Sequence, residues 1–221
     1  AMLWGYDKIS EWLSVAVAKK LEDVPESDIQ TPDWNVVGPA VESLRFAANS
    51  PTLREMYAKL IATSMNAEVA EKAHPSFVEI IKQLSPDEGK ILPLLRKNIV
   101  YPYISIFGEA QDLGTREIMK HWSDVCVEAG CDIPSYASVY LENLERLSIV
   151  EFNDQAEIEE EHYLKLEAME SVQELIANYK ESNPELNITI QRGVVSRTML
   201  GQIFLDACIG ESSGIQAKPV R

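Results

Sequence analysis

Apolar residues recur every three or four positions through the N-terminal part of the chain, as they do along the buried face of an amphipathic helix. The first stripe spans 7–23 and consists of Ile9, Leu13, Val17 and Leu21. A second helix is expected over 36–49. A third should begin at Ser50 and Pro51, because serine caps a first turn and proline fits its first position. Its apolar stripe runs over 53–65, so the pattern predicts a helical N-terminal region.

Prolines punctuate the next stretch, "AHPSFVEIIKQLSPDE". His74 precedes Pro75, and a residue before proline avoids helical geometry, so we expect one helix to end before His74 and another to begin at Pro75. Ser85 and Glu88 have the spacing of a capping box that opens a further helix. The buried face between these points would consist of Phe77, Ile80, Ile81 and Leu84. His74 is thus expected at a helix junction, where it caps or bonds a neighbouring backbone.

The pattern changes after residue 97. Residues 98–108 are rich in β-branched and aromatic side chains, which favours a strand. Pro102 should keep this strand short or at a sheet edge. A helix is expected over 115–130, and a second helix that leads into a strand over 135–153.

The rest of the chain completes a recognisable order of elements. The acidic stretch 154–182 is helix-prone, and we expect a strand through 188–190, a turn at Arg192-Gly193, a short strand over 194–196 and a closing helix. A helix that enters a strand, then a wing and a closing helix, is typical of a winged-helix unit. A generic α+β domain with a small sheet is the alternative.

We therefore predict a mainly α (α+β) fold with two domains. A helical domain would cover 1–97. A winged-helix-like domain with a small antiparallel sheet would cover 98–210, with 154–182 as an acidic helical insertion. Residues 211–221 are expected to form a flexible tail. With 221 residues, 46% of them apolar, the chain can bury a substantial core.

Charge narrows the classes of partner. The net charge is −15 and the sequence pI is about 4.6. Because such a chain repels phosphate backbones and its basic residues are scattered, nucleic-acid binding by this chain alone is disfavoured. No apolar run reaches the roughly 20 residues that span a bilayer, so we expect no membrane segment. Three cysteines without metal or disulfide spacing indicate buried thiols in a reducing compartment, hence a cytoplasmic protein: Cys126, Cys131 and Cys208.

Candidate chemistry is sparse. His74 could be a general base or metal ligand, but no second histidine lies at ligand spacing. His121 and His162 fall on predicted helices, and each is expected to be a surface or partly buried residue rather than a ligand. The acidic run 157–161 lacks the spacing and glycine of a calcium loop. No phosphate-binding glycine loop, nucleophile elbow or zinc-protease motif occurs. We expect no cofactor and no metal.

Two stretches resemble a known family. "GPAVESLRFAANSPTLREMYAKLIATSMN" followed by "AHPSFVEIIKQLSPDEGKIL" is similar to the core of the abortive infection alpha (Abi-alpha) domain family of bacteria, and "SRTMLGQIFLDACIG" resembles its C-terminal ending. The resemblance spans about residues 4–210. It implies a setting in phage defence and no particular reaction. It also implies that the family pattern includes Leu53, Arg54, Glu55, His74, Pro75, Ser76 and Phe77. Family members can carry a further N-terminal segment, and Ala1 before Met2 is typical of a cloning junction.

Three functions remain open at this stage. The first is an anti-phage protein-interaction module without catalytic activity, which binds a protein partner or self-associates, for example as a homodimer through its N-terminal helices. The second is a winged-helix regulator that binds nucleic acid, for which the helix over 135–147 would need positive surroundings. The third is a toxin-like nuclease, for which His74 or a carboxylate pair would converge in a cleft.

Overall fold

The computed structural model describes residues 5–47, 49–110, 114–156 and 158–209. It is an α+β structure dominated by helices, which confirms the predicted fold class. The chain divides into two compact units. Unit 1 comprises Ala1–Lys97 and Met199–Arg221, and unit 2 comprises Asn98–Thr198. In the sequence, unit 2 therefore lies between the two segments that make up unit 1.

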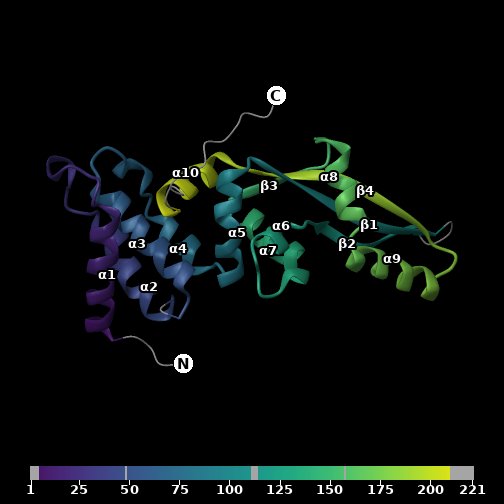
Figure 1. The fold of residues 1–221 in the computed structure, drawn as a ribbon, viewed down its shortest axis with the longest axis horizontal. Coiled ribbons are helices and arrows are strands. Elements are labelled where there is room, and N and C mark those ends of the chain that lie inside the picture. Colours follow the sequence, from purple (N-terminus) through teal and green to yellow (C-terminus); the bar gives the residue numbers. More distant parts are fainter. Residues whose placement is uncertain (1–4, 48, 111–113, 157, 210–221) are drawn as a thin grey trace. The chain divides into compact units, whose positions relative to one another are not determined.

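Unit 1 is a helical bundle built around one central helix (Figure 1). Its elements are α1 (Tyr6–Lys20), α2 (Trp34–Ala47), α3 (Pro51–Met65), α4 (Ser76–Lys82), α5 (Pro86–Lys97), α10 (Met199–Cys208) and two 3₁₀ turns, Glu26–Asp28 and Ala70–Lys72. Nine of the 15 residues of α3 are buried. The other five helices of unit 1 all contact α3, which explains why most of its residues are buried.

Local capping defines where two of these helices begin. The Ser50 hydroxyl accepts a hydrogen bond from the Leu53 amide at 3.3 Å, with Pro51 as the first residue of α3. At the start of α5, the Ser85 amide donates to the Glu88 carboxylate at 2.5 Å and the Glu88 amide donates to the Ser85 hydroxyl at 3.2 Å. The predicted capping box is confirmed.

The closing helix α10 packs within unit 1, although the sequence analysis placed it with the second region. Phe204 of α10 is fully buried and meets the ring of Phe77 edge-on, with 5.3 Å between centroids. The Thr63 hydroxyl of α3 donates to the carbonyl oxygen of Ala207 at 2.9 Å. Aromatic packing and a buried hydrogen bond thus attach α10 to α3 and α4.

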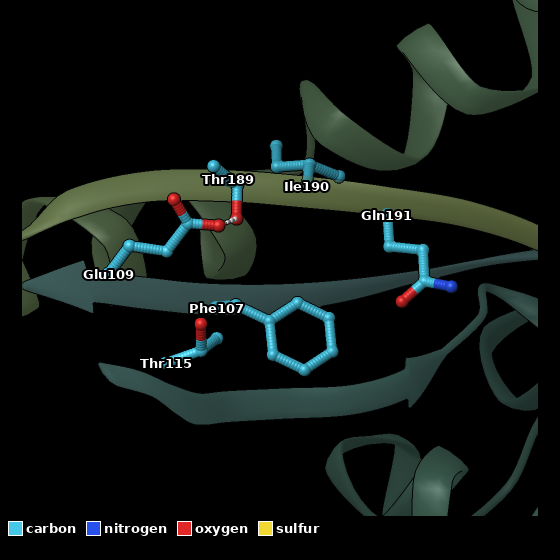
Figure 2. Close-up of a pocket in the computed structure, with 6 residues that line it drawn as sticks. All are labelled: Phe107, Glu109, Thr115, Thr189, Ile190 and Gln191. Atoms are coloured by element: carbon cyan, nitrogen blue, oxygen red, sulfur yellow. Dashed lines mark hydrogen bonds between the residues drawn. The ribbon is translucent and has the colours of Figure 1, made fainter.

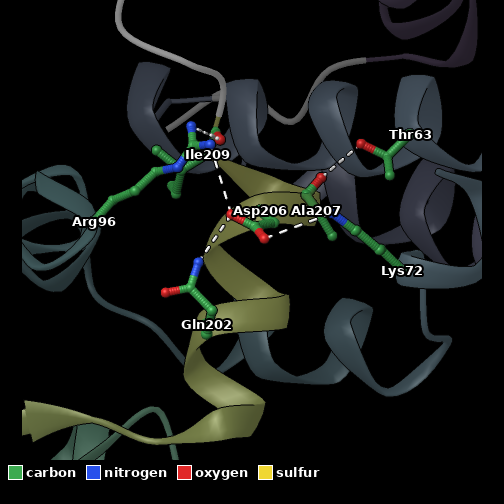
Figure 3. Close-up of polar contacts among 7 residues, drawn as sticks. All are labelled: Thr63, Lys72, Arg96, Gln202, Asp206, Ala207 and Ile209. Atoms are coloured by element: carbon green, nitrogen blue, oxygen red, sulfur yellow. Dashed lines mark hydrogen bonds and ion pairs between the residues drawn. The ribbon is translucent and has the colours of Figure 1, made fainter. Parts of the chain in front are cut away.

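A polar cluster holds the outer side of α10 (Figure 3). Asp206 accepts a hydrogen bond from Gln202 at 3.0 Å and lies 3.7 Å from the Lys72 ammonium and 3.6 Å from the Arg96 guanidinium. Arg96 also donates to the carbonyl oxygen of Ile209, the first residue after α10, at 2.8 Å. A cation near the last carbonyls of a helix is favourable, so these contacts fix the C-terminal end of α10.

Unit 2 is organised by an antiparallel sheet of four strands in the order β2-β1-β4-β3 (Figure 1). The strands are β1 (Val100–Ala110), β2 (Gly114–Trp122), β3 (Val150–Asn153) and β4 (Asn187–Arg197). The helices are α6 (Val125–Glu128), α7 (Ala137–Arg146), α8 (Glu160–Glu167) and α9 (Glu170–Ser182), with a 3₁₀ turn at Pro134–Tyr136. The central ladder pairs β1 with β4 from Val100↔Ser196 to Glu109↔Asn187.

Three expectations for this unit were wrong. Pro102 was expected to keep the first strand short or at a sheet edge, but β1 has 11 residues and lies between β2 and β4. Pro102 is tolerated because it pairs with Val194 of β4 and lies outside the part of β1 that pairs with β2.

Residues 115–130 do not form one helix: 114–122 are strand β2, and only Val125–Glu128 are α-helical. Ile118 and Trp122 are four residues apart, which suits a helix, but pairing with β1 prevails. The turn expected at Arg192-Gly193 is also absent, because β4 continues through it. Gly193 faces Tyr103 across the ladder, and its missing side chain leaves room for the tyrosine ring.

We predict that Gly193→Ala destabilises the protein. An added Cβ would collide with the Tyr103 hydroxyl oxygen and would lie 2.5 and 2.9 Å from two ring carbons, and Tyr103 is fully buried. Overpacking of this kind costs about 1–3 kcal/mol. Urea unfolding of the variant should show that loss. Gly38→Ala is the matched control, because its Cβ meets nothing within 4 Å inside α2 and should add about 1 kcal/mol. Equal stabilities for the two variants would contradict the packing account.

Candidate functional site

The family pattern expected from the sequence has two parts, Leu53–Glu55 and His74–Phe77, and residues of the first part connect α1 to α3. Leu53 is buried in the core. The Arg54 guanidinium lies over the Trp12 ring of α1, 5.2 Å from its centroid. The Glu55 carboxylate accepts from the Lys20 ammonium at 2.6 Å. One cation–π contact and one ion pair therefore join these two helices at separate points.

The second half of the motif forms the start of α4. His74 is exposed, and its Nδ1 accepts a hydrogen bond from the Ser76 amide at 3.2 Å and lies 2.7 Å from the Ser76 hydroxyl. The amide contact requires Nδ1 to be an acceptor, whereas either partner can donate in the hydroxyl contact. Pro75 precedes the helix directly, and Phe77 is fully buried against α10. The structure thus gives His74 a capping position at the helix junction.

Between α1 and α2 the surface of unit 1 is hollowed into a groove of about 580 Å³, here called the α1–α2 groove. Its wall on α1 consists of Tyr6, Asp7, Ile9, Ser10, Leu13, Ser14 and Val17. Its other lining residues are Pro32, Val37 and Val41 from α2 and the segment before it, and Ile61 and Met65 from α3. Ile9, Val17 and Ile61 are buried, whereas Leu13 and Val37 are half-buried. The lining is therefore mostly apolar and partly open to solvent.

The two ends of the groove are built differently. At the start of α1, the Arg45 guanidinium donates to the Tyr6 hydroxyl at 3.5 Å and lies 5.0 Å from the centroid of its ring. The opposite end is bounded by segment 21–33, which joins α1 to α2. Backbone hydrogen bonds hold this segment to the end of α3: Gln30 donates to Met65 at 2.8 Å, and Ala67 donates to Asp28 at 2.8 Å.

An exposed aromatic residue follows segment 21–33, two positions after the lining residue Pro32. Trp34, the first residue of α2, is 75% exposed. It precedes Val37 and Val41 by three and seven positions, so it continues their stripe along the helix. A large apolar side chain left in water beside an apolar groove marks a surface suited to binding.

Charge is distributed unevenly over the chain. Residues 98–198 contain seven basic against 19 acidic residues, a net charge of −12, and the remaining residues carry −3 of the total −15. Segment 21–33 has no basic residue and five acidic ones: Glu22, Asp23, Glu26, Asp28 and Asp33. Segment 21–33, which reaches the groove at Pro32, is therefore acidic, although its five carboxylates are not among the lining residues. Unit 2 is acidic as a whole.

In unit 2, sequence reasoning missed a buried histidine. His121 lies at the end of β2 with φ = 52°, next to a register irregularity in the β1–β2 ladder. The bulge turns its ring inward, where it stacks on Phe152 at 3.6 Å and meets Tyr103 edge-on at 4.9 Å. The Tyr103 hydroxyl donates to Asp154. No local signal revealed this, because the bulge depends on pairing with β1.

The ionisation of this cluster follows from burial. Loss of water around His121, assisted by Lys120, lowers the pKa of His121 to about 4, with Asp154 opposing. Burial, the hydrogen bond to Asp154 and its negative charge raise the pKa of Tyr103. Both rings are therefore neutral at pH 7 and pack against Phe152 of β3. His162, in contrast, is exposed on α8.

The sheet has a shallow hollow of about 450 Å³ on one face (Figure 2). Side chains from three strands line it, and the Thr189 hydroxyl donates to Glu109 at 3.2 Å.

Within the described residues, no group of three or more His, Cys, Asp or Glu could hold a metal ion. The three cysteines are buried and free, and burial raises the pKa of Cys208. No helix in the described ranges is long and apolar enough to cross a membrane.

We predict that His121 makes stability depend on pH in a particular window. Its folded-state pKa of about 4 lies below the ordinary value of 6.5. Between these two pH values His121 is protonated in the unfolded chain and neutral in the folded chain. The free energy of unfolding therefore falls as the pH drops below 6.5 towards 4. At pH 5.5 the loss from this group should be about 1 kcal/mol. His121→Asn tolerates a positive φ and cannot titrate, so urea unfolding should show a smaller loss between pH 7.5 and 5.5. Identical pH profiles would contradict this.

Comparison with known proteins places the chain in a family. A family model described as abortive infection alpha matches residues 5–208. No curated protein matches the chain. A solved structure of an uncharacterized protein from the marine bacterium Alcanivorax borkumensis SK2 is 16% identical, covers 61% of this chain and 92% of that chain, and has a TM-score of 0.43. Because the family model spans nearly the whole described chain, the chain belongs to the abortive infection alpha family.

Proposed function

We propose that this abortive-infection-associated protein is a protein-interaction module of a bacterial anti-phage system and that it docks its partner in the α1–α2 groove. The observation that carries the proposal is a mostly apolar groove of about 580 Å³ beside an exposed tryptophan. A groove of this size accommodates several side chains, and tryptophan is enriched among residues that dominate binding energy.

The expected motif residues support this role indirectly. Arg54 and Glu55 hold α1 against α3 through Trp12 and Lys20. The position of α1 sets the width of the groove, so these residues would act as positioning residues for the docking surface. We propose a cytoplasmic location, since three buried free thiols suit a reducing compartment.

A toxin-like nuclease receives less support. Its best residue, His74, uses Nδ1 to cap α4 and lies outside the residues that line either hollow. A general base needs to reach a reacting group in a water-excluding site. We therefore assign His74 a structural role.

A winged-helix regulator is the second candidate, favoured by topology alone. Helix α7 leads into β3, and the order β1-β4-β3 with α8 and α9 inserted before β4 is compatible with an enlarged wing. The charge of unit 2, −12, opposes contact with phosphates. The exposed surface of α7 includes Val139, Glu142 and Glu145, with Arg146 its one cation. Salt-sensitive binding of duplex DNA would be its signature.

We predict that Leu13→Glu abolishes phage protection while the protein stays folded. Leu13 is half-buried and lines the groove, so a carboxylate there opposes docking of an apolar surface. Val15→Glu is the matched control, because Val15 lies on the same helix, is 67% exposed and does not line the groove. The measurement is the efficiency of plating of phage on cells that express each full-length variant at equal soluble level. Equal protection by both variants would show that the groove is not needed for phage protection.

We predict that His74→Ala lowers the free energy of unfolding by about 1 kcal/mol, as loss of a helix cap does, and leaves protection intact. His162→Ala, at an exposed position, should change stability by less than about 0.5 kcal/mol. Chemical denaturation and phage plating of the same three proteins test this. A stable, soluble His74→Ala protein that no longer protects would place His74 in a working site and revive the enzyme hypothesis.

A further inference from the structure

We propose that the α1–α2 groove binds one amphipathic helix of a partner protein, in a single direction, with basic residues of that helix at the segment 21–33 end. This inference rests on the proposed function, because it specifies the occupant of the same groove.

The dimensions of the groove suit a helix of about three turns. The α1 wall runs from Tyr6 to Val17, which at 1.5 Å per residue is about 17 Å. Two helices form its sides and α3 forms its floor, the arrangement in which an apolar helix face inserts between helices. Ser10 and Ser14 lie one turn apart on the α1 wall and allow close approach. The Ser14 hydroxyl already donates to the Glu11 carbonyl at 2.9 Å, so docking does not deprive this hydroxyl of its acceptor.

Charge at the two ends gives the groove a direction. Segment 21–33 carries five carboxylates and Trp34 follows it at once, a combination that suits lysine or arginine by both charge attraction and cation–π contact. The other end carries the Asp7 carboxylate, which lines the groove, together with the Arg45 guanidinium over Tyr6, so the excess of carboxylates at segment 21–33 has no counterpart there. A helix with basic residues at one end therefore has one favourable orientation.

Other occupants fit less well. A second copy of the chain also carries −15, so long-range repulsion opposes self-association. An anionic lipid surface is repelled for the same reason. An extended strand would leave backbone groups unpaired against a wall of side chains. A basic amphipathic helix meets both the apolar lining and the acidic end.

The test uses the full chain and two labelled synthetic helices of about four turns. Both have leucines at i, i+3, i+4 and i+7. One carries three lysines at its C-terminal end and the other three glutamates at the same positions. Fluorescence anisotropy should show the lysine helix binding about tenfold tighter at low salt, with the ratio shrinking as salt rises. Leu13→Glu should abolish binding of both helices, whereas Val15→Glu should leave binding of both intact. A zero-length carbodiimide cross-link from the lysines should fall on 22–26.

Matched variants separate a local acidic end from overall charge. Glu22→Gln/Asp23→Asn/Glu26→Gln removes three exposed carboxylates from the segment. Glu170→Gln/Glu174→Gln/Glu181→Gln removes three exposed carboxylates from α9 of unit 2. The first triple variant should erase the preference for the lysine helix and the second should keep it. Equal losses in both, or cross-links spread over the chain, would overturn the inference.

The failure of this inference is distinguishable from failure of the proposed function. If Leu13→Glu loses phage protection but neither helix binds wild-type protein, the groove works and its occupant is not an amphipathic helix. If sedimentation shows a wild-type dimer that Leu13→Glu dissociates, the occupant is a second copy and the inference is wrong. If Leu13→Glu still protects, the proposed function itself fails.

Discussion

The antiparallel pairing of β1 with β4 is the constraint on which the rest of the structure depends. Its register sets Val100 opposite Ser196, so the inserted unit begins and ends at neighbouring positions. The chain can therefore leave unit 1 after α5 and return as α10 without breaking the helical bundle. Because α10 returns, Phe204 packs on Phe77 and Thr63 bonds the end of α10, which completes the surroundings of α3. The helix that forms the floor of the groove is thereby supported from its other sides.

The two units differ in the chemistry that they offer to partners. Unit 1 has the apolar α1–α2 groove and an exposed tryptophan. Unit 2 concentrates negative charge, and its buried histidine is engaged in aromatic packing. A strongly acidic unit keeps a protein soluble and repels nucleic acid and anionic membranes, which leaves proteins with basic surfaces as favoured partners. This division agrees with the proposal that a partner docks on unit 1.

Local signals in the sequence predicted the elements that depend on local contacts. Ser50 and the Ser85–Glu88 box set helix starts through hydrogen bonds within three residues, so they could be identified in advance. Residues 115–122 were misassigned because helical spacing and strand pairing compete there, and only the distant β1 decides. The Arg192-Gly193 pair predicted a turn, but Gly193 is required within β4 because it lies opposite the Tyr103 ring, and that contact depends on the distant strand β1.

The groove itself was beyond sequence reasoning for a related reason. Ile9, Leu13 and Val17 were all expected in the core, and the spacing that predicts an apolar face does not say how far another helix covers it. In the structure Ile9 and Val17 are buried while Leu13 stays half-exposed. The acidic segment could be seen in the sequence, but its place at one end of the groove depends on backbone pairing with the end of α3.

The most direct test of docking is photo-cross-linking in living cells during phage infection. A photoreactive amino acid replaces Leu13 in the groove or, in a second strain, Val15 on the same helix outside it. The account predicts a discrete cross-linked protein from position 13, with its attachment mapped to an amphipathic helix, and none from position 15. The same products from both positions, or none from position 13 in cells that are protected, would contradict docking in the α1–α2 groove.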